Sequence, residues 1–205
     1  VRRLVGSEMC IRDRHKRVDF KPYGGGPGMI IQYCPVKKAI DSLNQGKTIM
    51  LSPQGERLTQ KKLACLSNES NLNFICGRYE GVDQRIIDNL VDEEISIGDY
   101  VLSGGEIPAA AVIEGIVRLI PDIAENMSSI ENDSFSSYLL EYPQYTKPNL
   151  VDGLSVPDVL ISGNHSEVER WRRKHSLGVT MLKRPDLLKN VNLSKEDDRL
   201  LQEFI

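Results

Sequence analysis

The first 120 residues alternate between short apolar runs and segments with apolar residues at helical spacing. The runs at 48–51, 72–76 and 95–97 end in polar or glycine-containing turns, which is typical of buried strands in a parallel sheet. We predict 52–55 as the loop after the first strand. Helices are predicted at 36–43, at 59–67, through Ile86, Ile87 and Leu90, and at 106–120. This alternation predicts an α/β fold with a mostly parallel sheet.

The pattern changes after Pro121. Residues 122–137 are rich in Asn, Ser, Glu and Asp, which predicts a mobile linker. Beyond it, Asn164 and Glu167 form the start signal of a helix, and residues 194–205 read as a short capped amphipathic helix. We therefore predict four parts. Residues 1–14 show neither the strand nor the helix period and are predicted to be a non-native or misassigned leader. An α/β domain (15–121), the linker (122–137) and a helical domain (138–205) follow.

Two loops after predicted strands leave much of their backbone bare. Residues 77–81 and 96–106 carry glycines and short hydroxyl side chains, so that a ligand can reach N–H and C=O groups closely. At the ends of neighbouring strands they would form one crevice, the usual ligand position in an α/β sheet; ordinary connecting turns are the alternative. Residues 23–29 form a third glycine-rich loop, predicted to hold several residues at positive φ or to be pressed against a neighbouring segment.

Composition narrows the class of protein. The chain has 205 residues, 40% hydrophobic and 27% charged, as in a soluble protein of one domain with room for a small appendage. No apolar run is long enough for a membrane span, and four scattered cysteines without a C-x-x-C pair indicate a reduced, cytoplasmic protein. The net charge of −3 argues against coating nucleic acid by bulk electrostatics, but permits a local basic patch.

Several candidate motifs stay ambiguous or fail. A cluster of cations beside Trp171 either contacts nucleic-acid phosphates or forms a solvated helix face; its members are Arg170, Arg172, Arg173, Lys174 and His175. Residues 44–48 resemble a P-loop, but Asp41 replaces its first glycine. The histidines lack the spacing of a zinc site. Taken alone, Asp133 is a solvated loop residue and Arg118 complements a helix dipole.

Six motifs, taken together, resemble one family in order and spacing. They lie at 23–29, 52–55, 77–81, 96–106, 145–148 and 162–165, and they resemble TrmD, the bacterial tRNA (guanine-N1)-methyltransferases. The resemblance runs from about His15 to the end. It implies a trefoil-knotted SPOUT methyltransferase domain, a helical C-terminal domain and a homodimer with active sites between the subunits. Members of the family begin with a strand and helix ahead of the 23–29 motif, so we expect a truncated start here.

The resemblance also implies a reaction. The family transfers a methyl group from S-adenosylmethionine to N1 of guanosine 37 in tRNA, 3′ of the anticodon and preceded by another G. Asp133 matches the family's general base, and Arg118 matches the residue that stabilises charge developing on the guanine. The target base is flipped out to reach the site. Magnesium dependence belongs to the family, but we expect no dedicated metal site in this chain.

Binding residues follow from the same motif positions. Cofactor contacts, mostly through the backbone, are implied at Pro53, Gly77, Tyr79, Gly81, Ser96, Ile97, Gly98, Asp99, Tyr100, Val101, Leu102, Gly104 and Gly105. Contacts to the tRNA anticodon stem-loop are implied at Asp19, Gly28, Arg78, Glu80, Lys147, Arg170, Arg172 and Arg173. Two positions depart from the family, since Lys147 replaces a frequent arginine and Phe20 a usual aspartate; lysine lacks bidentate phosphate geometry.

Three other functions compete with this reading. A relative with the same knotted fold can act on another RNA nucleotide, but the Arg118–Asp133 pair and the 23–29 loop disfavour it. A truncated chain can also be a non-catalytic tRNA-binding fragment, which would bind tRNA but not the cofactor. A phosphate-hydrolysing enzyme is the third, and Asp41 argues against it.

Overall fold

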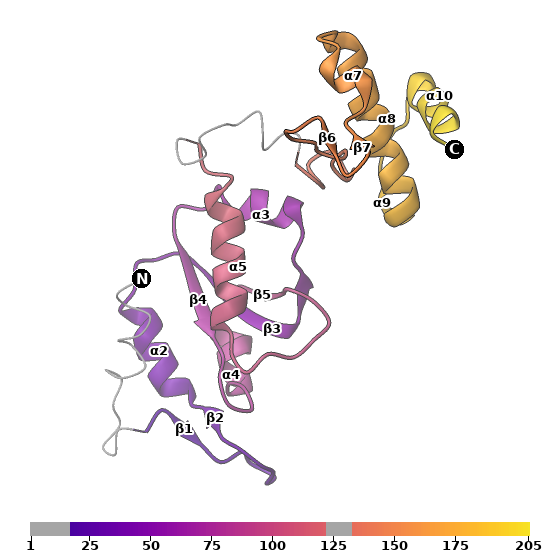
Figure 1. The fold of residues 1–205 in the computed structure, drawn as a ribbon. Helices are drawn as coiled ribbons and strands as arrows, with labels where there is room; N and C mark the ends of the chain where they lie inside the picture. The colour runs from indigo at the N-terminus through magenta and orange to yellow at the C-terminus, as the bar shows by residue number, and fades with distance from the viewer. Residues whose placement is uncertain (1–16, 122–132) are drawn as a thin grey trace. The chain divides into compact units, whose positions relative to one another are not determined.

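The chain divides into two compact units, Val1–Ala124 and Glu125–Ile205, and each is described by itself. The structure is a computed structural model that describes residues 17–121 and 133–205 (Figure 1). The predicted leader, 1–14, lies outside the described residues. Only 133–137 of the predicted linker are described, so the linker stays a prediction.

A three-stranded parallel sheet forms the centre of the first unit. The strand order is β4 (Leu72–Cys76), β3 (Lys47–Arg57) and β5 (Glu93–Ser96), which confirms the predicted parallel pairing. Ile49, Leu51 and Ile95 are buried on one face of this sheet. They pack against α3 (Gln60–Leu66) and α5 (Glu106–Val117), which cover that face (Figure 1). The apolar runs of the sequence thus become the core, because burying such side chains is the main favourable term in folding.

The prediction that residues 52–55 leave the sheet as a loop was wrong. Strand β3 continues to Arg57, and both Leu51 and Glu56 pair with Ile95, so the four residues between them bulge out of the ladder. Gly55 lies against the β5 backbone, where an added Cβ would come within 2.4 Å of the Glu94 carbonyl carbon. Such a bulge re-aims the chain beside a functional site without ending the strand.

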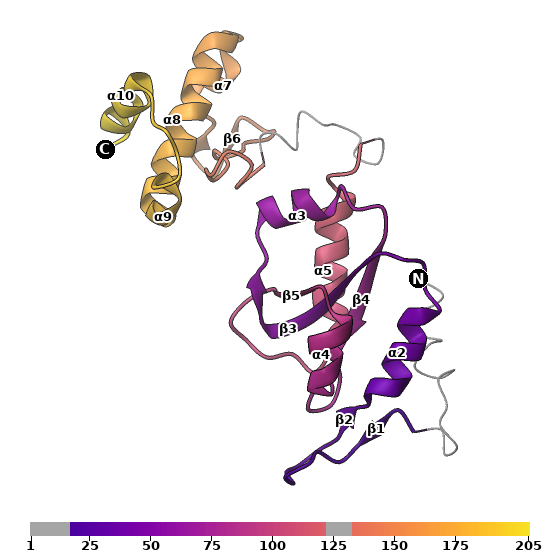
Figure 2. The ribbon, with the colours of Figure 1, turned by 180° about the vertical axis from the view of Figure 1, so that it is seen from behind.

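Two more helices are described in the first unit. Helix α2 (Tyr33–Asp41) begins three residues before and ends two residues before the predicted 36–43, and α4 (Gln84–Leu90) contains the predicted Ile86, Ile87 and Leu90 and is capped by the Asp83 side chain, which accepts from the Arg85 amide. Helix α4 packs against α2. Figure 2, from behind, shows α4 in front of the sheet, whereas α5 lies in front of it in Figure 1.

A two-stranded hairpin carries the glycine-rich loop. Strands β1 (Asp19–Phe20) and β2 (Ile30–Ile31) pair antiparallel, and the loop between them has positive φ at Gly24, Gly25, Gly26 and Gly28, which confirms that prediction. The loop docks on residues 78–81. The Glu80 amide donates to the Met29 carbonyl at 3.0 Å, and an added Cβ on Gly28 would lie 2.4 Å from Glu80 Cγ. Glycine is favoured at position 28 because its φ of 75° strains other residues, and a side chain there would also displace the exposed Glu80 side chain.

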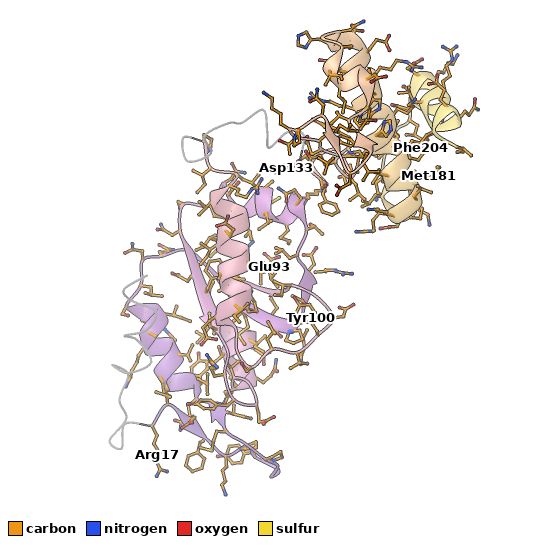
Figure 3. All side chains as sticks on the ribbon, viewed as in Figure 1. Arg17, Glu93, Tyr100, Asp133, Met181 and Phe204 are labelled. Atoms are coloured by element: carbon orange, nitrogen blue, oxygen red, sulfur yellow. The ribbon has the colours of Figure 1, made fainter. Side chains whose placement is uncertain are left out.

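The second unit is mainly helical. Its described part, 133–205, contains the helices α7 (Asp158–Ile161), α8 (His165–Lys183), α9 (Pro185–Leu188) and α10 (Lys195–Phe204). Leu139, Leu177 and Leu200 form its buried core. Helix α8 starts at the predicted Asn164 cap, and Phe204 of α10 packs onto Gly178, where any side chain would collide with its ring (Figure 3).

The sequence analysis missed a small hairpin, β6 (Leu150–Val151) with β7 (Leu154–Ser155), in the second unit. Asp152 and Gly153 link its strands with φ of 51° and 80°. Positive φ at both central residues is the geometry of the turns that favour Asp-Gly in hairpins.

Candidate functional site

A cavity of about 400 Å³ lies at the carboxyl ends of the three parallel strands of the first unit. Most of its lining comes from three segments: 50–54 from β3, 77–82 after β4, and 95–98 with 100–105 from β5 and the loop after it; Gln84, Ile87 and Pro108 add to it. The prediction placed the two glycine-rich loops on neighbouring strands, but β3 lies between β4 and β5 and its bulge supplies part of the wall. The crevice therefore belongs to three strands instead of two.

The two glycine-rich loops touch where α5 begins. The Gly105 amide donates to the Gly77 carbonyl at 3.0 Å, and an added Cβ on Gly105 would lie 2.7 Å from Cys76 Cα. A Cβ on Gly104 would instead meet the exposed side chains of Glu106 and Arg78. Glycine at 105 lets two backbones approach closely, and glycine at both positions keeps the cavity wall free of side chains.

The turn after β4 presents backbone to the cavity. Tyr79 has φ of 61° and Gly81 has φ of 123°, so the chain reverses sharply there. An added Cβ on Gly81 would meet nothing within 4 Å, which shows that the turn faces open space. A left-handed residue other than glycine is uncommon and marks such turns as candidates for binding.

The loop after β5 is held at its start and exposed further along. The buried Ser96 hydroxyl both accepts from the Gly98 amide (3.2 Å) and donates to the Gly98 carbonyl (3.1 Å). Tyr100, Val101 and Leu102 follow, and Val101 is 85% exposed; Figure 3 marks Tyr100 on this loop. Exposed apolar side chains beside a cavity are typical of binding surfaces.

Arg78 lines the cavity, and Cys76 precedes its Gly77 wall at the end of β4. Arg78 Nε donates to Glu106 Oε1 at 2.8 Å, and because both side chains are about half exposed the pair orients Arg78 more than it stabilises the fold. Burial raises the pKa of the Cys76 thiol to about 11. Cys76 is therefore protonated at neutral pH and is a poor nucleophile.

Most of the residues that the resemblance assigned to the cofactor line this cavity. Asp99 does not; the others are Pro53, Gly77, Tyr79, Gly81, Ser96, Ile97, Gly98, Tyr100, Val101, Leu102, Gly104 and Gly105. Arg78 and Glu80, assigned to the substrate, also line it. The sequence analysis missed Met50, Leu51, Ser52, Gln54, Val82, Gln84, Ile87, Ile95, Ser103 and Pro108. Nearly all flank predicted residues, and the missed β3 bulge accounts for those around Pro53.

The other candidate residues lie elsewhere in the two units. Asp19 is in β1, and Gly28 lies in the loop that docks on Glu80. Arg118 is exposed at the C-terminal end of α5 in the first unit. Asp133 is half-buried in the second unit, where its backbone carbonyl accepts from the Ser136 amide at 3.2 Å. Each of the two predicted catalytic residues is thus placed within its own unit only.

The basic helix α8 uses most of its cations inside the second unit. Arg173 binds both carboxylate oxygens of Asp197 (2.7 and 3.0 Å), and this contact lowers the pKa of that carboxyl to about 2. Arg170 pairs with Glu203 at 2.5 Å. Arg172, by contrast, is exposed, lies 5.0 Å from the centre of the Tyr142 ring, and lines a second cavity together with Lys147. The cations of the predicted nucleic-acid cluster therefore do not form one surface, because Arg170 and Arg173 pair with acids of α10 whereas Arg172 lines the second cavity.

Two further findings concern only the described residues. Within 17–121 and 133–205, no group of three or more His, Cys, Asp or Glu side chains is arranged to hold a metal ion. The helices in the same ranges are too short or too polar to span a bilayer.

The fold and the cavity define an α/β protein with a candidate ligand site at the carboxyl edge of a parallel sheet. Comparison with known sequences is more specific. Residues 7–190 match the model of the tRNA (Guanine-1)-methyltransferase family TrmD, and the chain belongs to this family.

Similar proteins agree with the family match. A tRNA (guanine-N(1)-)-methyltransferase of Shewanella piezotolerans is 52% identical over 198 residues, covering 94% of this chain and 80% of that protein. The protein of that name from Vibrio vulnificus shows the same identity and coverage. The one from Photorhabdus laumondii is 51% identical over 197 residues, covering 94% of this chain and 79% of its own length.

Proposed function

We propose that this chain methylates N1 of a guanine in tRNA, with S-adenosylmethionine as the methyl donor. The observation that carries the proposal is the cavity at the carboxyl ends of β3, β4 and β5, whose wall is built from glycine-rich backbone. The family membership supports the same reaction. We further propose guanosine 37, preceded by a second G, as the target.

The cavity fits a ligand of this kind. Its volume of about 400 Å³ lies within the range of small-molecule and cofactor sites. The turn at 77–81 and the loop at 96–105 offer N–H and C=O groups, which are sufficient to recognise the uncharged edge of an adenine. When bound, S-adenosylmethionine supplies a methyl group on a positively charged sulfur. The residues proposed to hold it are those of the cavity wall, and Asp99 drops out of that set because it does not line the cavity.

The chemistry proposed for the chain's own residues is proton removal and charge stabilisation. Guanine N1 carries a proton at neutral pH, so Asp133 accepts that proton as N1 forms its bond to the methyl carbon and the carbon–sulfur bond breaks. Negative charge that develops toward O6 is stabilised by Arg118. Asp133 ends the step as a neutral carboxylic acid and returns its proton to water. Cys76 does not compete as a methyl acceptor, because burial raises its pKa to about 11.

The trefoil knot, the homodimer and the tRNA-binding role of the helical domain are part of the same proposal. Exposed apolar side chains on the first unit support a subunit interface there. Val101 is 85% exposed, Ile107 at the start of α5 is 69% exposed, and Ile113 further along the helix is 42% exposed. Covering such side chains is the ordinary reason for a stable dimer. A dependence on Mg²⁺ is proposed without a protein site for the ion.

Methyl transfer from labelled S-adenosylmethionine to a tRNA transcript tests the proposal. The transcript carries G at the target position and G before it. We expect transfer by the chain, loss of transfer with Asp133→Ala, and no transfer to a transcript with A at the target. Cofactor binding by Asp133→Ala, measured by calorimetry, is the control, and it should remain within twofold. Transfer at an unchanged rate by Asp133→Ala would remove the aspartate from the mechanism.

A further inference from the structure

The segment 133–141 opens the described part of the second unit and ends against helix α8. Asp133, the proposed general base, is its first residue and is labelled in Figure 3. Near the other end of the segment, Leu139 is 3% exposed and packs with Leu177 and Leu200 in the core of the unit. The chain that follows Asp133 is therefore anchored in the second unit by a buried apolar side chain.

Two hydroxyl groups one helical turn apart hold the next residue, Leu140, by its backbone. Thr180 Oγ1 accepts from the Leu140 amide at 2.8 Å, and Ser176 Oγ donates to the Leu140 carbonyl. Side chains at i and i+4 lie on the same face of a helix, so α8 presents both groups to one residue. The pair binds the N–H and the C=O of Leu140 together, as a neighbouring strand does in a sheet.

The Thr180 hydroxyl is buried and both of its roles are in use. The residue is 0% exposed, and its hydroxyl donates to the Ser176 carbonyl at 2.6 Å while it accepts from the Leu140 amide. An amide that is shielded from water and loses its acceptor carries the full cost of its desolvation. We therefore expect removal of this hydroxyl to release Leu140 from α8.

The segment after Asp133 closes on this anchor. Ser134 Oγ accepts from the Glu141 amide at 3.0 Å, and the Phe135 amide donates to the Leu139 carbonyl at 2.7 Å. Phe135 has φ of 75°, a conformation that is uncommon outside glycine and typical of a tight turn. These contacts fold the segment into a closed loop, and the backbone of Asp133 is held where that loop begins.

We propose that Thr180 is a positioning residue for the general base. Its hydroxyl fixes Leu140, and through the closed loop it fixes the backbone that carries Asp133. A base acts only within hydrogen-bond reach of the proton that it removes, and a displacement of about 1 Å can lower a rate about 10²-fold. The proposal rests on the proposed function, because it needs Asp133 to take the proton of guanine N1. It adds a buried hydroxyl of α8 to the groups on which that step depends.

Three variants of the full chain separate positioning from a general contribution to folding. Thr180→Val keeps the shape of the side chain and removes the hydroxyl, whereas Thr180→Ser keeps the hydroxyl. Ser194→Ala is the matched control, because the Ser194 hydroxyl also accepts from a backbone amide of the second unit, that of Asp197. At saturating tRNA and S-adenosylmethionine, we expect kcat to fall at least about tenfold in Thr180→Val and to stay within about threefold in the other two.

Cofactor affinity should stay within twofold in all three variants, because the residues that line the proposed cofactor cavity belong to the first unit. Circular dichroism checks that each variant is folded. Ser134→Ala removes the contact at the other end of the loop and should lower kcat at least about fivefold, so it carries the test if Thr180→Val does not fold. An unaltered kcat in folded Thr180→Val, or in Ser134→Ala where only that variant folds, would overturn the proposal.

A double variant shows whether the hydroxyl acts through the base. With enzyme in excess over tRNA, adding Thr180→Val to Asp133→Ala should slow the residual transfer by no more than about twofold, because misplacing a base has no effect once its carboxylate is gone. A further loss of about tenfold would mean that Thr180 acts on the reaction by another route, and the positioning role would be refuted.

Amide hydrogen exchange, followed by mass spectrometry, gives a readout that needs no activity. Peptides covering 135–141 should exchange at least about tenfold faster in Thr180→Val, and at an unchanged rate in Thr180→Ser and Ser194→Ala. Transfer by the unmodified chain together with unchanged exchange in Thr180→Val would refute the positioning role and leave the proposed function standing. If the unmodified chain transfers no methyl group while exchange responds as expected, the proposed function fails, and the anchor is then a structural contact only.

Discussion

Replacing Gly105 by alanine tests how closely the two cavity loops must approach. Gly105 has φ of −82° and ψ of −3°, a conformation that alanine adopts without strain, so the substitution isolates a steric effect. The added Cβ would lie 2.7 Å from Cys76 Cα and 3.1 Å from the Gly77 nitrogen. Both are backbone atoms at the end of β4, and they cannot rotate away as a side chain would. The loop before α5 must therefore move away from β4.

We expect this overpacking to cost about 1–3 kcal/mol. If the strain is relieved by opening the cavity, the cofactor must close it again on binding, and its affinity falls by about 5- to 150-fold. Urea denaturation measures the stability, and calorimetric titration with S-adenosylmethionine measures the affinity. Gly153→Ala is the control, because Gly153 lies on the β6–β7 turn at φ of 80° with open space around it. It should lose about 1 kcal/mol of stability without any change in cofactor affinity.

A Gly105→Ala chain with unchanged stability and unchanged cofactor affinity would refute this reasoning. It would show that the contact between the two loops yields easily, and that the glycine is not required to bring them together.

Three further predictions concern single residues. The hydrogen bond from Arg173 lowers the pKa of Asp197 to about 2. The contribution of the ionised Asp197 carboxylate to stability is therefore complete above about pH 4 and is lost as the pH falls toward 2. Asp197→Asn should destabilise the chain by about 2 kcal/mol at pH 7 in urea titrations and flatten this pH dependence; an unchanged acid profile would contradict it. Iodoacetamide at pH 7.5 should modify the exposed Cys34 and Cys65 well before Cys76, as followed by peptide mass spectrometry, and equal rates would contradict the raised pKa. Arg118→Ala should lower kcat about 10²- to 10³-fold with cofactor affinity within twofold, and an unaltered kcat would exclude the proposed charge stabilisation.

Local patterns sufficed where a segment's own residues decide its structure. The strand at Leu72–Cys76 is apolar at four of its five positions, and α8 and α10 are capped by Asn164 and Ser194, whose side chains accept from backbone amides as predicted. Residues 52–55 were misread for the opposite reason. Pro53 and Gly55 signal a turn locally, but Leu51 and Glu56 on either side both pair with β5, which is distant in sequence, so the segment becomes a bulge within one strand instead of the loop that ends it.

The cavity was predicted more fully than the role of the basic helix. Glycine has no side chain and leaves its backbone uncovered wherever it lies, so the loops at 77–81 and 96–105 could be recognised directly from the sequence. The sequence of a cationic helix, in contrast, does not show which acid or ligand each cation contacts. Arg170, Arg172 and Arg173 look alike in sequence, yet two of them bind acids of α10 and only Arg172 faces the second cavity. That division depends on how α10 packs on α8, which a local pattern does not reveal.

The most direct test of the central claim is to locate the methyl group on the product. A tRNA transcript is incubated with the chain and S-adenosylmethionine and digested to nucleosides and to nuclease fragments, and both digests are analysed by mass spectrometry against standards. We predict N1-methylguanosine as the modified nucleoside, in the single fragment that carries the guanosine 3′ of the anticodon. A methyl group on another atom or another nucleotide, or a fully unmodified transcript, would contradict the account.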